Sequence, residues 1–345
     1  MAGWNSVALI SLVFICTSTL FLFYQESHHF DISRLTDGFH TYAAQDWHDD
    51  AASHLKDEDF GLSHNDSQGL EASLAKPHVD LVVASTTTDN TTWVSDRLRN
   101  WRAMIYNTDD PDAPLTVPLN KGKETMVYLT YIIDNYHSLP DYAIFTHANR
   151  FQWHNDDPDY DGLAVLRRLQ LPHIHSQGYV NLRCVWVLGC PVEIRPFDDE
   201  GDTDPYKKTA SVYKRAFQEL MPGMEVPPQV GQSCCAQFAA TRETILSRER
   251  SEYEGMREWI MATDLDDATS GRVFEYMWHI IFGKEAVHCP DANACYCKLF
   301  GLCDLQCEQG QCENRYTLPP SVVLPDGWPL VDWDGSSRRF LGTGL

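Results

Sequence analysis

Basic residues are scarce in this chain of 345 residues, which contains 27 lysines and arginines against 49 aspartates and glutamates. The formal net charge is therefore -22 at pH 7. Extended, non-specific binding to nucleic acid requires a positive surface, so the acidic surplus argues against this kind of binding. The acidic surplus instead favours cationic ligands, or a metal ion held by carboxylates.

Several signatures of familiar enzyme classes are also missing. The sequence contains no P-loop, no glycine fingerprint for a dinucleotide, no G-x-S-x-G motif and no internal repeat. Chemistry on nucleotide phosphates by the first two routes is therefore unsupported, and order alone assigns no Ser/His/Asp triad.

One long apolar run stands near the N-terminus. Residues 7–24 read VALISLVFICTSTLFLFY and carry no formal charge. At 1.5 Å per residue they would form about 27 Å of helix, which is just enough for the hydrocarbon core of a bilayer. We predict that residues 1–24 anchor a single-pass membrane protein, with the side of the membrane undecided. A cleaved signal peptide is the alternative.

The body of the protein is predicted from apolar periodicity that begins after a polar, aperiodic stem at residues 25–77. Alternating strands and helices are expected there, with strands at 79–85, 141–147 and 179–187 and helices at 123–136 and 163–171. This order predicts an α/β catalytic domain over residues 78–285, with a mostly parallel sheet and flanking helices of glycosyltransferase-A-like or Rossmann-like type. A proline-rich tail is expected at 317–345.

Of the 11 cysteines, six crowd into residues 289–312. Zinc sites usually repeat C-x2-C spacing, which is missing here. We therefore predict disulfides, with a cysteine-rich extension at 286–316, and keep metal binding as the alternative. The adjacent Cys234 and Cys235 are expected to be bridged rather than nucleophilic. Two N-x-S/T sequons, at Asn65 and Asn90, are candidate glycosylation sites.

A loop of histidines and carboxylates follows the predicted strand 141–147, at the sheet edge where α/β proteins bind ligands. It contains His147, His154, Asp156 and Asp157. Its Asp-x-Asp spacings could coordinate a divalent cation, or its carboxylates and rings could pocket a guanidinium. An aspartate-rich surface loop with capping roles is the alternative.

A second cluster lies on a helix that is predicted to begin near Asp266 and Asp267, in an Asp/Thr/Ser run typical of a helix N-terminus. Glu275 and His279 are four residues apart and are therefore expected to be neighbours on one helix face. A carboxylate that orients an imidazole is the usual arrangement for a general base. A stabilising surface pair, or half of a metal site, would use the same spacing.

Six blocks of sequence together resemble a filamentous-fungal family that was long catalogued as uncharacterised and that includes the arginine-containing cyclodipeptide synthases. The resemblance covers roughly residues 79–315, and the blocks occur in the order NKGKE (120–124), YIIDNY (131–136), WHNDD (153–157), GYVNLRC (178–184), CCAQF (234–238) and SGRVFEYMWH (270–279). It implies an aminoacyltransferase that joins arginine to a second amino acid as a cyclic dipeptide, from two aminoacyl-tRNAs. No cofactor and no stable protein partner are implied, and a divalent metal stays open.

In this interpretation an amine attacks an activated ester, and the protein positions it, accepts a proton and stabilises the oxyanion. The nominated catalytic residues are Glu275, His279, His147 and His154, and the nominated substrate-binding residues are Asp156, Asp157, Asp266 and Asp267. The candidate contacts to tRNA are Arg167, Arg168, Lys207, Lys208, Lys214 and Arg215. The family's acidic motif places a glutamate a few residues after two aspartates, whereas Glu275 lies eight residues after Asp267.

The competing hypothesis is a metal-dependent glycosyltransferase of the secretory pathway, with a type II membrane anchor. An anchor, a stem, a disulfide-bonded α/β domain and Asp-x-Asp tripeptides such as Asp264-Leu265-Asp266 agree with it. It suits the compartment better, because aminoacyl-tRNA is not expected in the secretory lumen. A non-enzymatic binding protein is a third hypothesis.

Overall fold

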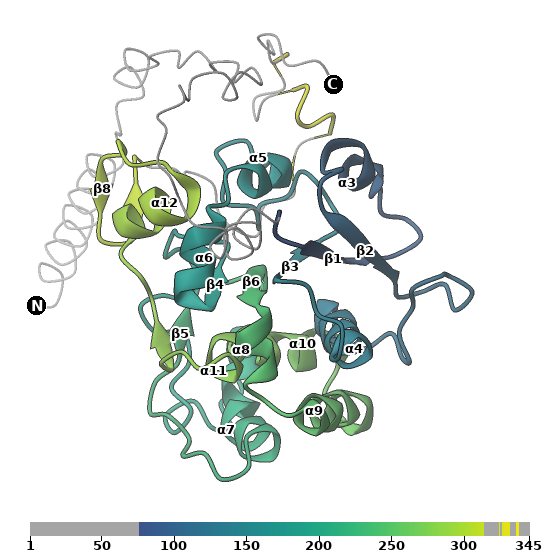
Figure 1. The fold of residues 1–345 in the computed structure, drawn as a ribbon. Coiled ribbons are helices and arrows are strands. Elements are labelled where there is room, and N and C mark those ends of the chain that lie inside the picture. The colour runs from purple at the N-terminus through teal and green to yellow at the C-terminus, as the bar shows by residue number, and fades with distance from the viewer. Residues whose placement is uncertain (1–75, 314–323, 325, 332–335, 338–345) are drawn as a thin grey trace, which may run out of the picture. The chain divides into compact units, whose positions relative to one another are not determined.

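The computed structural model describes residues 76–313, 324, 326–331 and 336–337, which fall in one compact unit, Leu70–Leu345 (Figure 1). The main sheet has the strand order β2-β1-β3-β6-β4. Its strands are β1 (Val79–Ser85), β2 (Arg102–Asn107), β3 (Tyr142–His147), β4 (Tyr179–Asn181) and β6 (Phe238–Thr241). β1 pairs in parallel with β2 and β3, whereas β6 runs antiparallel between β3 and β4. The predicted α/β class, with a mainly parallel sheet and flanking helices, is confirmed.

Helices cover both faces of this sheet, because successive side chains of a strand point to opposite faces and both sets are apolar. Val82 and Phe145 belong to one core, with α4 (Glu124–Asn135), α7 (Lys208–Leu220), α9 (Arg250–Ala262), α10 (Asp267–Glu275) and α11 (Trp278–Ile281). Leu81 and Ile144 belong to a second core, with α3 (Thr92–Arg97), α5 (Gly162–Arg167), α6 (Leu171–Gln177) and α12 (Ala292–Phe300). The smaller elements are η2 (Pro205–Lys207), α8 (Arg242–Leu246), β5 (Gly231–Gln232), β7 (Val287–His288), β8 (Cys307–Glu308) and β9 (Gln311–Cys312).

Two elements are shorter than the sequence predicts. The helix expected at 163–171 ends after Arg167 and restarts as α6, which has Pro172 in its first turn. Proline suits a first turn and disrupts a helix interior. The strand expected at 179–187 ends at Asn181, because the backbone amides of Cys184 and Val185 donate to the Asp156 carboxylate instead of continuing the sheet.

All ten cysteines of the described body form disulfides, which confirms the predicted framework and the cysteine-rich C-terminal extension. Cys184–Cys295 and Cys190–Cys289 join residues that are 111 and 99 positions apart, so they tie this extension to the body. Cys297–Cys303 and Cys307–Cys312 are local. The fifth bond joins the neighbours Cys234 and Cys235.

The predicted single-pass membrane location is wrong for the part of the chain that the structure describes. None of its helices is long and apolar enough to cross a membrane. The amphipathic helices α7 and α9 have 13 residues each, and a spanning helix needs about 20 apolar ones. The predicted anchor at residues 7–24, the stem up to residue 75 and the sequon at Asn65 lie outside the described residues.

Candidate functional site

A pocket of about 310 Å³ lies at the carboxyl ends of β1 and β3, where Ser85 and His147 are the last strand residues. In the sheet β2 lies on one side of β1 and β3 lies on the other, so the chain order reverses direction at β1. The pocket therefore lies at the switch point of the sheet, where open α/β proteins bind ligands. The other lining residues are Ala84, Thr86, Asp89, Thr108, Asn120, Lys123, Glu124, Ala148, Asn149 and Asp267.

Glu124 brings a carboxyl into this pocket from the first turn of α4. Burial raises the pKa of this carboxyl to about 7, and the nearby Asp267 charge acts in the same direction. A group with such a pKa can both accept and release a proton near neutral pH. Residue spacing did not predict a role for Glu124, although this residue ends the block NKGKE (120–124).

Glu275 approaches Glu124 because α10 packs closely on the turn before α4. A Cβ atom on Gly271 would come within 2.9 Å of the Gly122 carbonyl oxygen, so only glycine fits there without a shift. The Glu275 side chain is 14% exposed. Burial raises its pKa, and the charge of Glu124 raises it further. Two carboxyls that share one site cannot both ionise easily.

Two predicted histidines lie together at the end of β3. The rings of His147 and His154 meet edge to face with centroids 4.7 Å apart. Burial lowers both pKa values, that of His154 to about 2, so both imidazoles are neutral at pH 7. His147 lines the pocket, and its buried Nε2 has no hydrogen-bond partner among the described residues. Because Nε2 is buried, other atoms of His147 make its contact with the pocket.

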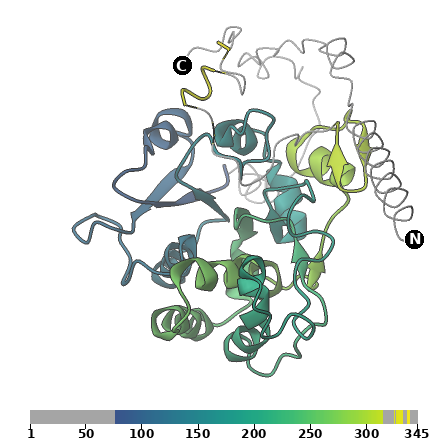
Figure 2. The same cartoon turned by 180° about the vertical axis from the view of Figure 1, so that it is seen from behind.

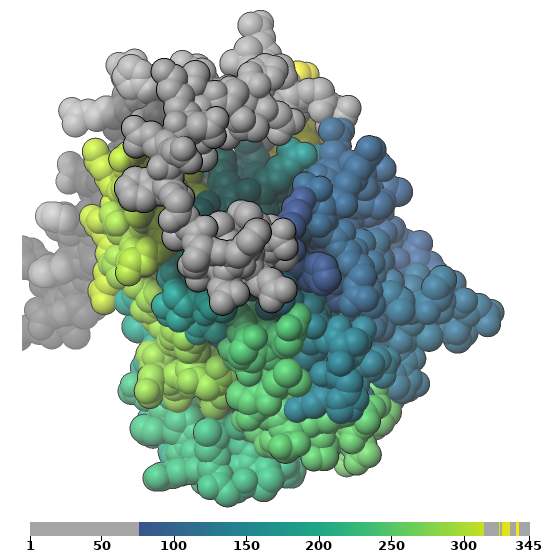
Figure 3. Space-filling model, viewed as in Figure 1, coloured from purple at the N-terminus to yellow at the C-terminus, as the bar shows by residue number. Residues whose placement is uncertain are grey.

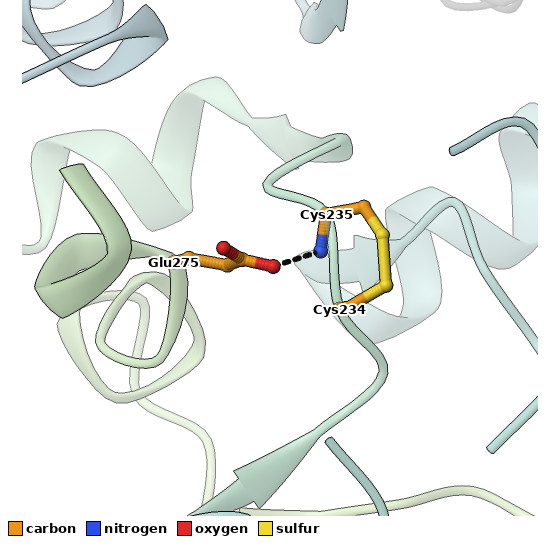
Figure 4. Close-up of side chains that lie close together, drawn as sticks. All are labelled: Cys234, Cys235 and Glu275. Atoms are coloured by element: carbon orange, nitrogen blue, oxygen red, sulfur yellow. Dashed lines mark hydrogen bonds between the residues drawn. A yellow bond between two sulfur atoms is a disulfide. The ribbon is translucent and has the colours of Figure 1, made fainter. Parts of the chain in front are cut away.

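The bonded pair Cys234–Cys235 lies beside Glu275, whose carboxylate accepts a hydrogen bond from the Cys235 backbone N–H (Figure 4). Cys235 and the following Ala236 have φ values of 91° and 47°, in the left-handed region that non-glycine residues rarely occupy. These three side chains are the one group of close metal-capable residues in the described chain. Because the two sulfurs are bonded to each other, neither is a thiolate, so the oxidised pair is no metal site.

The predicted dyad of Glu275 and His279 does not form. Gln232 donates its amide hydrogen to the Glu275 carbonyl oxygen, which a continuous helix would bond to the amide of residue 279. The helix accordingly ends at Glu275 and restarts as α11 at Trp278. His279 is fully buried and bonds the Ala286 carbonyl oxygen through Nε2 (2.9 Å). Burial lowers its pKa to about 4.

Asp156 and Asp157 hold their own loop rather than line the pocket. Asp156 accepts hydrogen bonds from the Cys184 amide (2.5 Å) and from the Tyr296 hydroxyl (2.6 Å). Asp157 accepts from the Asp159 amide (2.9 Å) and pairs with Arg168 at 3.2 Å. The guanidinium that Asp157 contacts thus belongs to the chain itself.

The other predicted carboxylate pair divides its roles. Asp266 caps α10 by accepting from the Thr269 amide at 2.8 Å, and it pairs with Lys208. Asp267 lines the pocket and pairs with Lys123, with 2.6 Å between the charged atoms. Asp267 is therefore the one nominated substrate-binding aspartate that reaches the cavity.

Most of the basic residues nominated for tRNA are paired with carboxylates. The pairs are Arg168–Asp157, Lys207–Asp199, Lys208–Asp266, Lys214–Glu200 and Arg215–Glu219. The sequon residue Asn90 is exposed in the loop after β1, where its side chain accepts from the Thr92 amide.

The fold and this site define an α/β protein with a ligand-sized pocket, lined by carboxylates and an imidazole, at the carboxyl edge of its sheet. The chain belongs to the family described as "Protein of unknown function (DUF3431)", whose pattern matches residues 81–298. The matched region includes every residue that lines the pocket. Comparisons with curated proteins and with solved structures gave no significant match.

Proposed function

We propose that this protein is a glycosyltransferase that transfers a sugar from a nucleoside diphosphate to an acceptor hydroxyl, with Glu124 as the general base. The carrying observation is that Glu124, with its raised pKa, lines a pocket at the switch point of the sheet. In the reaction Glu124 takes the proton of the acceptor hydroxyl, whose oxygen attacks the sugar carbon. The bond from that carbon to the diphosphate breaks, and the nucleoside diphosphate leaves.

The sheet supports this proposal. A mainly parallel sheet with one internal antiparallel strand, β6, suits a glycosyltransferase-A-like fold better than an all-parallel Rossmann-like sheet. The N-terminus of α4 also opens on the pocket, with Lys123 at its cap position and no side-chain cap. The positive end of this helix dipole favours a diphosphate group, which would compete with Asp267 for the Lys123 side chain and its backbone N–H.

The disulfides support an oxidising compartment, such as the secretory lumen, where sugar transfer is common. The same compartment disfavours aminoacyl-tRNA as a substrate. The paired state of the nominated basic residues disfavours it as well, because phosphate contacts need uncompensated positive charge.

A divalent ion is the usual partner of a diphosphate beside carboxylates. No three metal-capable ligand atoms of Asp89, Glu124, Asp267 and His147 lie within 4.8 Å of one another in the described chain. Asp267 is paired with Lys123, and Asp89 accepts from the Thr86 amide. The residues therefore do not form a ready-made metal site, and no step of the proposed reaction passes through a metal.

Arginine-containing cyclodipeptide synthesis is the second candidate. The acidic lining of the pocket favours it, because Asp89, Glu124 and Asp267 would suit a guanidinium group. In that reaction Glu124 would take a proton from the attacking amine, and a tRNA would leave from the ester.

One experiment separates the two candidates. The purified protein is incubated with a panel of sugar nucleotides and acceptors, and the released nucleoside diphosphate is measured. Extracts of cells that express the protein are searched in parallel by mass spectrometry for arginine-containing diketopiperazines. We expect nucleotide release that is lost in Glu124→Gln and kept in Glu258→Gln, a matched change at an exposed glutamate of α9. Diketopiperazine without nucleotide release would replace the first candidate by the second.

A further inference from the structure

A second pocket, of about 160 Å³, lies beside β4 at the edge of the sheet. It is enclosed by α6, α12 and β7, and α6 and α12 lie side by side in both cartoon views (Figure 1) (Figure 2). The space-filling view shows the yellow-green C-terminal segment next to the teal one that contains α6 (Figure 3). The disulfide Cys184–Cys295 links α12 to the chain just after β4, so these two sides of the pocket are held together by a covalent bond.

The lining of this pocket has the opposite charge to the chain as a whole. No aspartate or glutamate is among its described lining residues, although the chain contains 49 acidic and 27 basic residues. Instead it holds the nitrogen-bearing side chains of His173, Arg183, His288 and Lys298. Gln177, Asn181 and Ser233 add neutral polar groups.

The four nitrogen-bearing side chains are held at different depths. Arg183 is 3% exposed, and its Nη1 donates to the carbonyl oxygens of Trp153 (3.0 Å) and His154 (3.3 Å), which fix the guanidinium. His173 and His288 are half-buried, and Lys298 is exposed at the rim without an ion pair to any described residue. Burial lowers the pKa values of His173 and His288, that of His288 to about 4, so both imidazoles are neutral at pH 7 and can donate only as neutral N–H groups. The positive charge of the lining is therefore that of Arg183 and Lys298, with no lining carboxylate to offset it.

We propose that this pocket binds a small oxyanion of the phosphate or sulfate type, with Lys298, His173 and His288 as donors and Arg183 as a fixed buried charge. Charge-assisted hydrogen bonds from several nitrogen donors are the usual means of holding such an ion. The proposal does not rest on glycosyl transfer, because the pocket beside β4 shares no lining residue with the one at β1 and β3.

The test is calorimetric titration of inorganic phosphate, and separately of sulfate, into the full chain at neutral pH and constant ionic strength. We expect one saturable site per chain. Lys298→Ala and His288→Ala should each weaken binding by about tenfold or more. Lys214→Ala, which removes the same charge from α7, should leave the affinity unchanged. A phosphorylated sugar, titrated in the same way, tells whether the pocket takes a phosphate ester as well as the free ion.

Two results would overturn this assignment. One is the absence of saturable binding of phosphate, sulfate and the phosphorylated sugar. The other is binding of equal strength in the wild type, Lys298→Ala and His288→Ala, which would place the anion elsewhere. Thermal unfolding without anion shows that each variant is folded, and Lys298 is the safer position because its side chain is exposed.

Discussion

The Glu275 carboxylate accepts a hydrogen bond from the backbone N–H of Cys235, so the end of α10 is joined to the bonded cysteine pair (Figure 4). This contact holds the Glu275 side chain in a largely buried position near Glu124 and the end of β3. Burial raises the pKa values of both glutamates. The pair can therefore hold a proton near neutral pH, which exposed glutamates cannot do.

Replacing Glu124 by glutamine should remove the proposed base without a large change in volume. Nucleoside diphosphate release should fall by about 10²- to 10⁴-fold, the usual contribution of general base catalysis. Initial rates of the wild type, Glu124→Gln and the control Glu258→Gln provide the measurement. Equal rates for all three would remove Glu124 from the mechanism.

Glu124 should also make stability depend on pH. Its pKa is raised from 4.5 to about 7, so its contribution to stability is fully present below pH 4.5 and is lost as the pH rises through 7. Between pH 5 and pH 8 the free energy of unfolding of the wild type should fall more than that of Glu124→Gln. After allowance for partial exposure the difference is on the order of 1–2 kcal/mol. Urea denaturation at both pH values measures it, and parallel losses in the two proteins would contradict it.

The long-range disulfide Cys184–Cys295 and the vicinal disulfide Cys234–Cys235 should differ in their effects on stability and activity. Removing Cys184–Cys295, which joins residues 111 positions apart, should lower the free energy of unfolding by about 4 kcal/mol, because it frees a long loop in the unfolded chain. Replacing Cys234 and Cys235 by alanine frees almost no loop and should cost much less. It should still lower activity, because the backbone N–H of residue 235 that donates to Glu275 is no longer held in place by the disulfide.

Denaturation and activity of the two double-alanine variants together check this contrast. A vicinal-pair variant with full activity would show that the ring does not position Glu275.

Asp156 should act on stability rather than on substrate binding. It is 2% exposed and accepts from the Cys184 amide and the Tyr296 hydroxyl. Asp156→Ala leaves these buried donors without their acceptor and should lower the free energy of unfolding by about 3 kcal/mol. Tyr296→Phe should cost less, because the Cys184 amide keeps its acceptor. A change in the substrate KM of the folded Asp156→Ala protein, with stability unchanged, would instead support the predicted role in binding.

The sequence predicted best where apolar periodicity was strong. Residues 79–85 were predicted as a strand and form β1, and the helix predicted at 123–136 is α4. The edge strand β2 was missed, because its outer residues are exposed and its pattern is weak. β6 was missed as well. Its four residues follow a cysteine pair and are all buried, so they show no alternation of apolar and polar side chains.

The site was harder to predict than the fold. His147 and Asp267 were nominated and line the pocket, because they lie next to element ends that the sequence marks. Glu124 was missed, since nothing local shows that the start of α4 meets α10. The dyad of Glu275 and His279 was expected from helical spacing, and a side-chain bond from the distant Gln232 coincides with the break in that helix. Long-range contacts of this kind are not encoded in residue spacing.

The proposed function depends most on the pocket at β1 and β3 being the substrate site. Asn149 is exposed and lines this pocket, so Asn149→Trp should fill it without disturbing the core. Ser176→Trp, at an exposed position of α6 outside both pockets, is the matched control. Calorimetric titration with nucleoside diphosphates should show saturable binding to the wild type and to Ser176→Trp, and none to Asn149→Trp. Equal binding to all three proteins, or to none, would contradict the account.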